Sequence, residues 1–237
     1  HQEARRQRQM CIRDSIISSK KFSEYTDFPM PDDYPDYPSG AELLAYFNSY
    51  VNKFNLKQHI KFNTKVIKAI PLENKWKLFF EDSSEDFDYL IVANGHHWSP
   101  RIPTFEGEFS GELMHSHQFK NNEYFKDKSV LVVGGGNSAC DIAVEVSRVA
   151  KKTSISMRRG YHFIPKFMMG IPSDAYYAKT LWIPQRIRLF FQKLALRFVQ
   201  GNYENYGLQK PDHDILQSHA TVNSELLYFI KQGKISP

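Results

Sequence analysis

The stretch SVLVVGGGNSACDIAVEV, residues 129–146, sets the fold class of this chain. An apolar run leads into three consecutive glycines, and an amphipathic segment follows them directly. This order predicts a β-strand, a tight turn and an α-helix. The segment TSISMRR, which starts at residue 153, predicts a second strand. Together they predict a βαβ unit in an α/β fold.

The glycines of this stretch have the spacing of a dinucleotide-binding turn. Gly134, Gly136 and Ala139 occupy the GxGxxG/A positions. The first glycine allows the turn, the second lets a pyrophosphate approach the backbone, and the small third residue lets helix and strand pack. Asn137 and Ser138 start the helix, where amide donors and the helix dipole favour phosphates, and either could also serve as a helix cap. The alternative is a merely tight glycine turn.

Two arginines at the end of the second strand predict which nucleotide binds. An NAD site would place an acidic residue here to hold the ribose hydroxyls. This chain has Arg158 and Arg159 instead. Guanidinium groups pair well with a 2′-phosphate, which favours NADPH over NADH. Two solvated surface arginines are the alternative.

The bulk composition restricts the class of protein. The chain has 237 residues, and its net charge of +5 is spread out, which favours a mildly basic surface over a nucleic-acid partner. Its two cysteines, Cys11 and Cys140, form no CxxC pair, which disfavours zinc ribbons and dithiol centres and predicts a reducing, cytoplasmic location. No apolar run reaches the roughly 18 residues of a membrane span.

Upstream of the glycine turn, residues 1–15 show no periodicity and look foreign to the protein. The proline-rich residues 28–40 predict an extended loop. Ser39 and Glu42 have the spacing of a capping box and predict a helix. Alternation predicts strands at residues 59–70 and 75–81 joined by a hairpin turn at 72–75, and an apolar strand over residues 86–95.

Downstream, residues 183–199 predict an amphipathic helix. We expect its apolar stripe to pack against a domain, with a membrane-surface helix as the alternative; the stripe comprises Ile187, Phe190, Phe191, Leu194 and Phe198. Residues 223–234 predict a short helix capped by Asn223 or Ser224, followed by a last strand.

The stretch FEGEFSGELMHSHQFK, residues 105–120, carries a longer motif. Phe109, Gly111, His115 and Phe119 spell FxGxxxHxxxF. With GGGNSACD, the proline-rich loop and NYGL at residues 205–208, this motif resembles the flavin-containing monooxygenases over nearly all of residues 18–237. The resemblance implies an α/β flavoprotein fold with two Rossmann-like, three-layer dinucleotide-binding domains.

The resemblance also explains why the glycine turn stands in mid-chain. Members of the family carry an N-terminal GxGxxG for FAD and a second one for NADPH in an inserted domain, and only the second is found here. It implies an incomplete, interior fragment: residues 1–15 non-native, 16–121 part of the FAD-binding domain and 122–237 part of the NADPH-binding domain. We expect the fragment alone to be inactive.

For the whole protein, the resemblance implies an enzyme of the N,N-dimethylaniline monooxygenase type. It would use FAD, NADPH and O2 to oxygenate soft nitrogen or sulfur centres of a small molecule through a C4a-hydroperoxyflavin. A Baeyer–Villiger monooxygenase is the alternative enzyme, although its motif normally ends in tryptophan where this chain has Phe119. A non-catalytic NADP(H)-binding module is the alternative outside enzymes, and a homo-oligomer is left open.

The resemblance places three more residues beside FAD: Ala93, Asn94 and Gly95, in the family's strand-end element. It puts His115 at a domain junction, where organising a hinge or a hydrogen-bond network is favoured over proton transfer. No residue is assigned a catalytic role. No metal site is expected, because the histidines 96, 97 and 117 lack metal-ligand spacing.

Overall fold

The computed structural model describes residues 16–95, 99–215, 217–218 and 221–237. Its internal contacts divide the chain into two compact units. One unit runs from Phe47 to Glu108, and the other joins Phe109–Pro237 to the chain up to Tyr46. The predicted FAD-binding part at 16–121 and NADPH-binding part at 122–237 remain predictions, and the expectation that residues 1–15 are foreign falls outside the described residues.

Helix α3 (Gly40–Lys53) starts at the predicted capping box. The Ser39 amide and hydroxyl both donate to the Glu42 carboxylate, at 2.7 and 2.8 Å, and the Glu42 amide donates back to the Ser39 hydroxyl at 3.2 Å. These bonds satisfy donors that a helix start leaves unpaired. The proline-rich residues before α3 contain no helix, as predicted.

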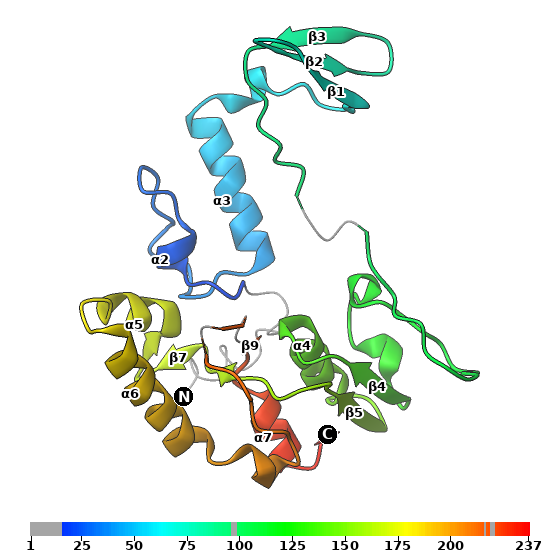
Figure 1. Cartoon of the computed structure of the whole chain (residues 1–237), viewed down its shortest axis with the longest axis vertical. Helices are drawn as coiled ribbons and strands as arrows, with labels where there is room; N and C mark the ends of the chain where they lie inside the picture. Colours follow the sequence, from blue (N-terminus) through cyan, green and yellow to red (C-terminus); the bar gives the residue numbers. More distant parts are fainter. Residues whose placement is uncertain (1–15, 96–98, 216, 219–220) are drawn as a thin grey trace. The chain divides into compact units, whose positions relative to one another are not determined.

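The smaller unit holds an antiparallel sheet in the order β1-β2-β3 (Figure 1). Its strands are β1 (Lys68–Pro71), β2 (Trp76–Phe79) and β3 (Ser84–Phe87), preceded by the short helix η2 (Leu56–His59). The predicted turn between β1 and β2 is confirmed, because the Leu72 amide donates to the Lys75 carbonyl at 2.8 Å.

Two strand predictions in this unit are wrong. Of residues 59–70, only the end enters β1, and the predicted strand at residues 86–95 stops at Phe87. Tyr89, Ile91 and Val92 are 89%, 88% and 74% exposed. An apolar strand is stable only when neighbouring strands take up its backbone hydrogen bonds, and the described residues offer this segment no such partner.

The larger unit contains the predicted βαβ unit. Strand β4 (Ser129–Val133), helix α4 (Asn137–Val146) and strand β5 (Lys152–Ser156) follow in order, and β4 pairs with β5 in parallel. The last strand, β10 (Ile235–Ser236), was also predicted and lies parallel to β5 on its other side. The carboxyl ends of β4 and β5 therefore meet at one edge of the sheet, where ligands of such sheets bind.

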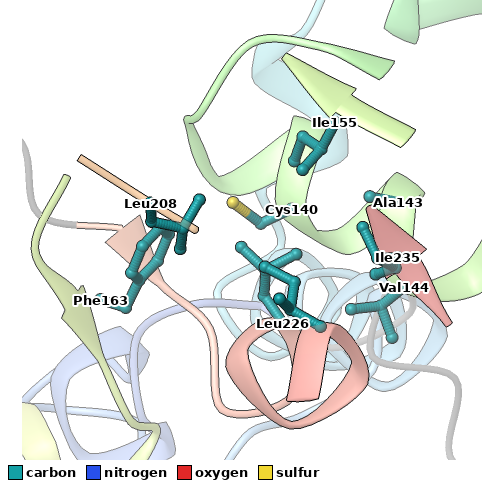
Figure 2. Close-up of a cluster of buried hydrophobic side chains, with 9 residues drawn as sticks. Cys140, Ala143, Val144, Ile155, Phe163, Leu208, Leu226 and Ile235 are labelled. Atoms are coloured by element: carbon teal, nitrogen blue, oxygen red, sulfur yellow. The ribbon is translucent and has the colours of Figure 1, made fainter. Parts of the chain in front are cut away.

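The core of this unit lies between the sheet and two helices. Cys140 and Val144 of α4 are fully buried, and they meet Leu226 of α7 (Leu226–Lys231), Ile155 of β5 and Ile235 of β10 (Figure 2). The α7 helix is the predicted one, but its N-cap is Glu225 and not Asn223 or Ser224. Asn223 Oδ1 still accepts from the amides at 225 and 226, at 2.9 and 2.7 Å. This packing holds α4 firmly against the strands that flank the glycine turn.

The long helix α6 and several short elements complete this unit; Figure 1 labels α2, α5, α6, β7 and β9 among them. They are α2 (Lys20–Ser23), η3 (Ser116–Gln118), η4 (Glu123–Phe125), β6 (Phe163–Ile164), β7 (Phe167–Met168), β8 (Ile171–Pro172), α5 (Ser173–Lys179), α6 (Gln185–Gln200), η5 (Tyr203–Tyr206) and β9 (Thr221–Val222). β6 pairs with β9 in parallel, and β7 pairs with β8 in an antiparallel hairpin.

Helix α6 is the predicted amphipathic helix, but its predicted packing is wrong. Its inward face is mixed: Leu196 is buried there, Arg188 donates to the Tyr177 hydroxyl at 2.9 Å, and Gln200 donates to the Phe163 carbonyl at 2.7 Å. The predicted apolar stripe is exposed instead, at 48% for Ile187, 63% for Phe190, 59% for Phe191, 54% for Leu194 and 90% for Phe198. Within the described ranges, no helix combines the length and apolar character needed to cross a bilayer.

Candidate nucleotide-binding site

The glycine turn occupies the edge where β4 and β5 end. Gly134 has φ +133°, in the region that favours glycine, and its amide donates to the Ser156 carbonyl at 2.8 Å. A Cβ on Gly134 would lie 3.3 Å from the Cβ of Ala139. A side chain at Gly134, or a larger one at Ala139, would therefore push α4 away from β4.

Gly136 leaves the mouth of the turn open. It is the N-cap of α4 with φ −80° and ψ 177°, so its backbone conformation is one that any residue adopts. A Cβ built there would meet nothing within 4 Å. The absence of a side chain therefore keeps space clear next to the first amides of α4, which lack helical acceptors. Such a cradle fits a pyrophosphate.

Asn137 and Ser138 are the first residues of α4, and neither side chain caps the helix. Asn137 Oδ1 instead accepts from the Val222 amide at 2.7 Å. Ser138 is exposed at the mouth of the turn. The structure thus leaves Ser138 accessible to a ligand and uses the Asn137 side chain to hold the turn.

Arg158 and Arg159 follow β5 at the same edge, and both are exposed. β5 was predicted to run into them but ends at Ser156. The Arg159 guanidinium lies 5.5 Å from the centre of the Tyr161 ring. That ring packs on Gly135 so closely that a Cβ there would lie 2.2 Å from it. Tyr161 therefore links Arg159 to the turn, a contact that the sequence pattern did not reveal.

A pocket of about 140 Å³ opens beside Arg159. Its lining includes Met157, Gly160 and Tyr161 near the end of β5, and Leu208 and Gln209 from later in the chain. Ligand clefts measure roughly 300–1,000 Å³, so this pocket can hold only one end of a dinucleotide.

Burial raises the pKa values of two side chains of α4 that lie next to the turn, Asp141 and Cys140. Desolvation raises the pKa of Asp141 to about 6, although a hydrogen bond from Asn223 and the charge of Lys166 oppose this shift. Desolvation, with the nearby Asp141 charge, also raises the pKa of the Cys140 thiol to about 12. Cys140 is therefore a protonated core residue with no nucleophilic role at neutral pH.

The FxGxxxHxxxF residues all lie in the larger unit. The Phe109 ring covers Gly111, where a Cβ would lie 2.4 Å from the ring. His115 Nδ1 accepts from the His117 amide at 3.2 Å, and the His115 amide donates to Gln118 at 2.9 Å, so His115 caps η3. Phe119 is buried and stacks on another phenylalanine at 5.5 Å. These contacts stabilise the segment that leads to β4.

The residues expected beside FAD belong to the smaller unit. Ala93, Asn94 and Gly95 are all exposed, and Gly95 has φ +73°. Their backbone is accessible, but this stretch alone encloses no ligand. Within the described ranges, no group of three or more histidine, cysteine or acidic residues could hold a metal ion; His96 and His97 lie outside those ranges.

The chain matches one protein family over nearly its whole length. The protein-family model described as flavin-binding monooxygenase-like matches residues 1–236. Human flavin-containing monooxygenase 5 is 32% identical over 244 residues, which cover 93% of this chain and 45% of that protein. The rabbit (Oryctolagus cuniculus) N-oxide-forming dimethylaniline monooxygenase 2 is 32% identical over 247 residues, covering 94% and 46%. The chain thus spans about half the length of these relatives.

Solved structures show the same fold. A flavin-containing monooxygenase from Stenotrophomonas maltophilia matches with a TM-score of 0.65 at 18% identity, covering 94% of this chain and 55% of that one. The structure of OTEMO in complex with FAD and NADP matches with a TM-score of 0.65 at 16% identity, covering 93% and 56%.

Proposed function

This chain belongs to the flavin-binding monooxygenase-like family, and on that premise we propose that it contributes part of the FAD-binding domain and part of the NADPH-binding domain to an FAD- and NADPH-dependent monooxygenase. The predicted fold class, an α/β two-dinucleotide-binding flavoprotein fold, is confirmed. The proposed substrates are small molecules with soft nitrogen or sulfur centres, which O2 would oxygenate. FAD and NADPH would supply the redox chemistry, because protein side chains carry no hydride or activated oxygen.

The observation that carries this proposal is the open cradle at Gly136. Space for a phosphate lies beside the amides that start α4, and Gly134 with Ala139 keeps that helix close to β4. In this proposal the amides from Gly136 to Ala139 bind the pyrophosphate, and Ser138 donates its hydroxyl to it.

Arg158 and Arg159 would select the nucleotide. Both are exposed at the edge of the sheet that carries the turn. A guanidinium pairs with a phosphate through two parallel hydrogen bonds, which a ribose hydroxyl cannot match. We expect the pocket beside Arg159 to receive the adenosine end, while Ala93 to Gly95 would approach FAD in the complete protein.

Calorimetric titration of the chain with NADPH and NADH tests the site. Changing both Arg158 and Arg159 to alanine should weaken NADPH at least tenfold and leave NADH nearly unchanged, since charge-assisted hydrogen bonds are worth about 1.5–3 kcal/mol. Changing Arg186 and Arg197 to alanine removes the same charge from exposed positions of α6 and should change neither affinity. Equal losses of NADPH and NADH would contradict the phosphate contact.

Product analysis tests the reaction. The complete protein should convert tertiary amines and thioethers to N-oxides and sulfoxides when FAD, NADPH and O2 are supplied. Conversion of ketones to esters instead would identify the Baeyer–Villiger alternative. Nucleotide binding with no oxygenated product would favour the binding module.

A further inference from the structure

Residues 221–223, here called the clamp segment, lie on the buried side of the glycine turn. Thr221 and Asn223 are 2% and 4% exposed. Their backbone bonds to β6 and to the residue before it. The Thr221 amide donates to the His162 carbonyl and the Asn223 amide donates to the Ile164 carbonyl, both at 3.0 Å. The clamp segment is therefore fixed by the sheet on one side.

Its other side bonds to the turn and to α4. The Thr221 hydroxyl donates to the Gly135 carbonyl at 2.8 Å, and the Val222 amide donates to Asn137 Oδ1 at 2.7 Å. Asn223 Nδ2 donates to Asp141 Oδ1 at 2.7 Å. One of these bonds reaches the backbone of the turn, at the Gly135 carbonyl, and the other two reach side chains of α4. One segment therefore contacts both the turn and the start of the helix.

The bond to the Gly135 carbonyl has a geometric consequence. In a planar trans peptide, the carbonyl of one residue and the amide hydrogen of the next point in opposite directions. Because Thr221 draws the Gly135 carbonyl into the protein, the Gly136 amide points to the other side. A Cβ on Gly136 would also meet nothing within 4 Å, so the space around this residue is open.

We infer that Thr221 is a positioning residue for dinucleotide binding: its hydroxyl fixes the peptide between Gly135 and Gly136 so that the Gly136 amide faces the pyrophosphate. This inference rests on the proposed function, since it needs a nucleotide at the turn. Without the hydroxyl, the Gly135 carbonyl keeps only the long, weak bond from the Cys140 thiol at 3.7 Å and can rotate outward, where its partial negative charge would repel a phosphate. Thr221 itself would touch no part of the nucleotide.

Two nearby hydroxyls provide matched controls. Thr153 of β5 is equally buried, and its hydroxyl has no partner among the described residues. Ser147 follows α4, and its buried hydroxyl donates to the Val144 carbonyl at 2.7 Å. Thr153→Val tests the loss of a buried hydroxyl, and Ser147→Ala tests the loss of a buried hydrogen bond away from the turn.

The experiment measures NADP+ affinity of the chain by calorimetry, together with the melting temperature of each variant without ligand. Thr221→Val should weaken NADP+ about three- to tenfold, the range expected for one net hydrogen bond. Thr221→Ser keeps the hydroxyl and should restore most of the affinity. Ser147→Ala should lower the melting temperature without weakening NADP+, and Thr153→Val should change the affinity little.

The failure of this inference is distinguishable from the failure of the proposed function. If the unaltered chain binds no NADP+, both are overturned. If it binds NADP+ and Thr221→Val binds equally well, or Thr221→Ser gives no rescue, only the positioning role is overturned. Equal weakening in Ser147→Ala would likewise assign the effect to stability and not to the orientation of the peptide.

Discussion

Helices α4 and α6 belong to the same compact unit, and both have an amphipathic sequence, yet only α4 buries its main apolar face. α4 places Cys140, Ala143 and Val144 completely inside the core. α6 buries Leu196 together with polar side chains such as Arg188 and leaves its phenylalanines in solvent. Periodicity identifies a helix and an apolar face, but only a partner surface decides whether that face is buried.

The largest expected difference in the free energy of unfolding is between changes at two leucines: Leu226 of α7, which packs against the buried face of α4, and Leu194 of the exposed face of α6. Leu226→Ala empties space against α4 and should lower the free energy of unfolding by about 2–5 kcal/mol. Leu194→Ala on α6 is the matched change at a 54% exposed site and should cost less than about 1 kcal/mol. Urea denaturation of both variants measures this; similar losses would show that the stripe of α6 is covered in solution.

A second prediction uses the buried carboxyl of α4. The pKa of Asp141 is about 6 when folded, above its ordinary 3.8, because burial disfavours the charged form. Folding therefore favours the protonated acid: the contribution of Asp141 to stability is greatest below pH 4 and is lost as the pH rises through 6, by at most about 3 kcal/mol. Asp141→Asn should remove this part of the slope. Parallel pH profiles for both proteins, measured by denaturation at each pH, would contradict the assignment.

A third prediction separates two glycines that precede α4. Gly134→Ala forces a side chain into a φ of +133° beside Ala139 and should destabilise the chain by about 1–3 kcal/mol. Gly136→Ala has an ordinary backbone conformation and open space, so stability should change by less than about 0.5 kcal/mol. Its Cβ would enter the phosphate cradle, and calorimetry should show at least a tenfold loss of NADP+ affinity. Unchanged affinity would contradict the site.

The smallest effect is expected on the exposed face of α6. Phe198 is 90% exposed, so Phe198→Glu removes almost no buried contact and should change the free energy of unfolding by less than about 0.5 kcal/mol. The same variant should reduce self-association at high concentration, measured by light scattering, because the exposed apolar patch shrinks. A clear loss of stability would show that α6 packs through this residue.

Local patterns predicted much of the fold because their causes are local. The capping box at Ser39 and Glu42, the turn after β1 and the β4–α4–β5 unit depend on residues close in sequence. The strand predicted at residues 86–95 failed because a strand needs distant partners for its backbone. Among the candidate site residues, the glycines were recognisable from their spacing.

The sequence by itself determined the βαβ unit, the tight turn with its small residues at Gly134, Gly136 and Ala139, and the two arginines after β5, because each follows from short-range sterics or from the order of apolar segments. Only the tertiary structure decided that Tyr161 covers Gly135 and that Thr221 holds its carbonyl. Thr221 lies 86 residues beyond Gly135. A hydrogen bond between residues so far apart in the chain corresponds to no local sequence pattern, so the sequence does not predict it. It forms only when the folded chain places Thr221, which pairs with β6, against the glycine turn.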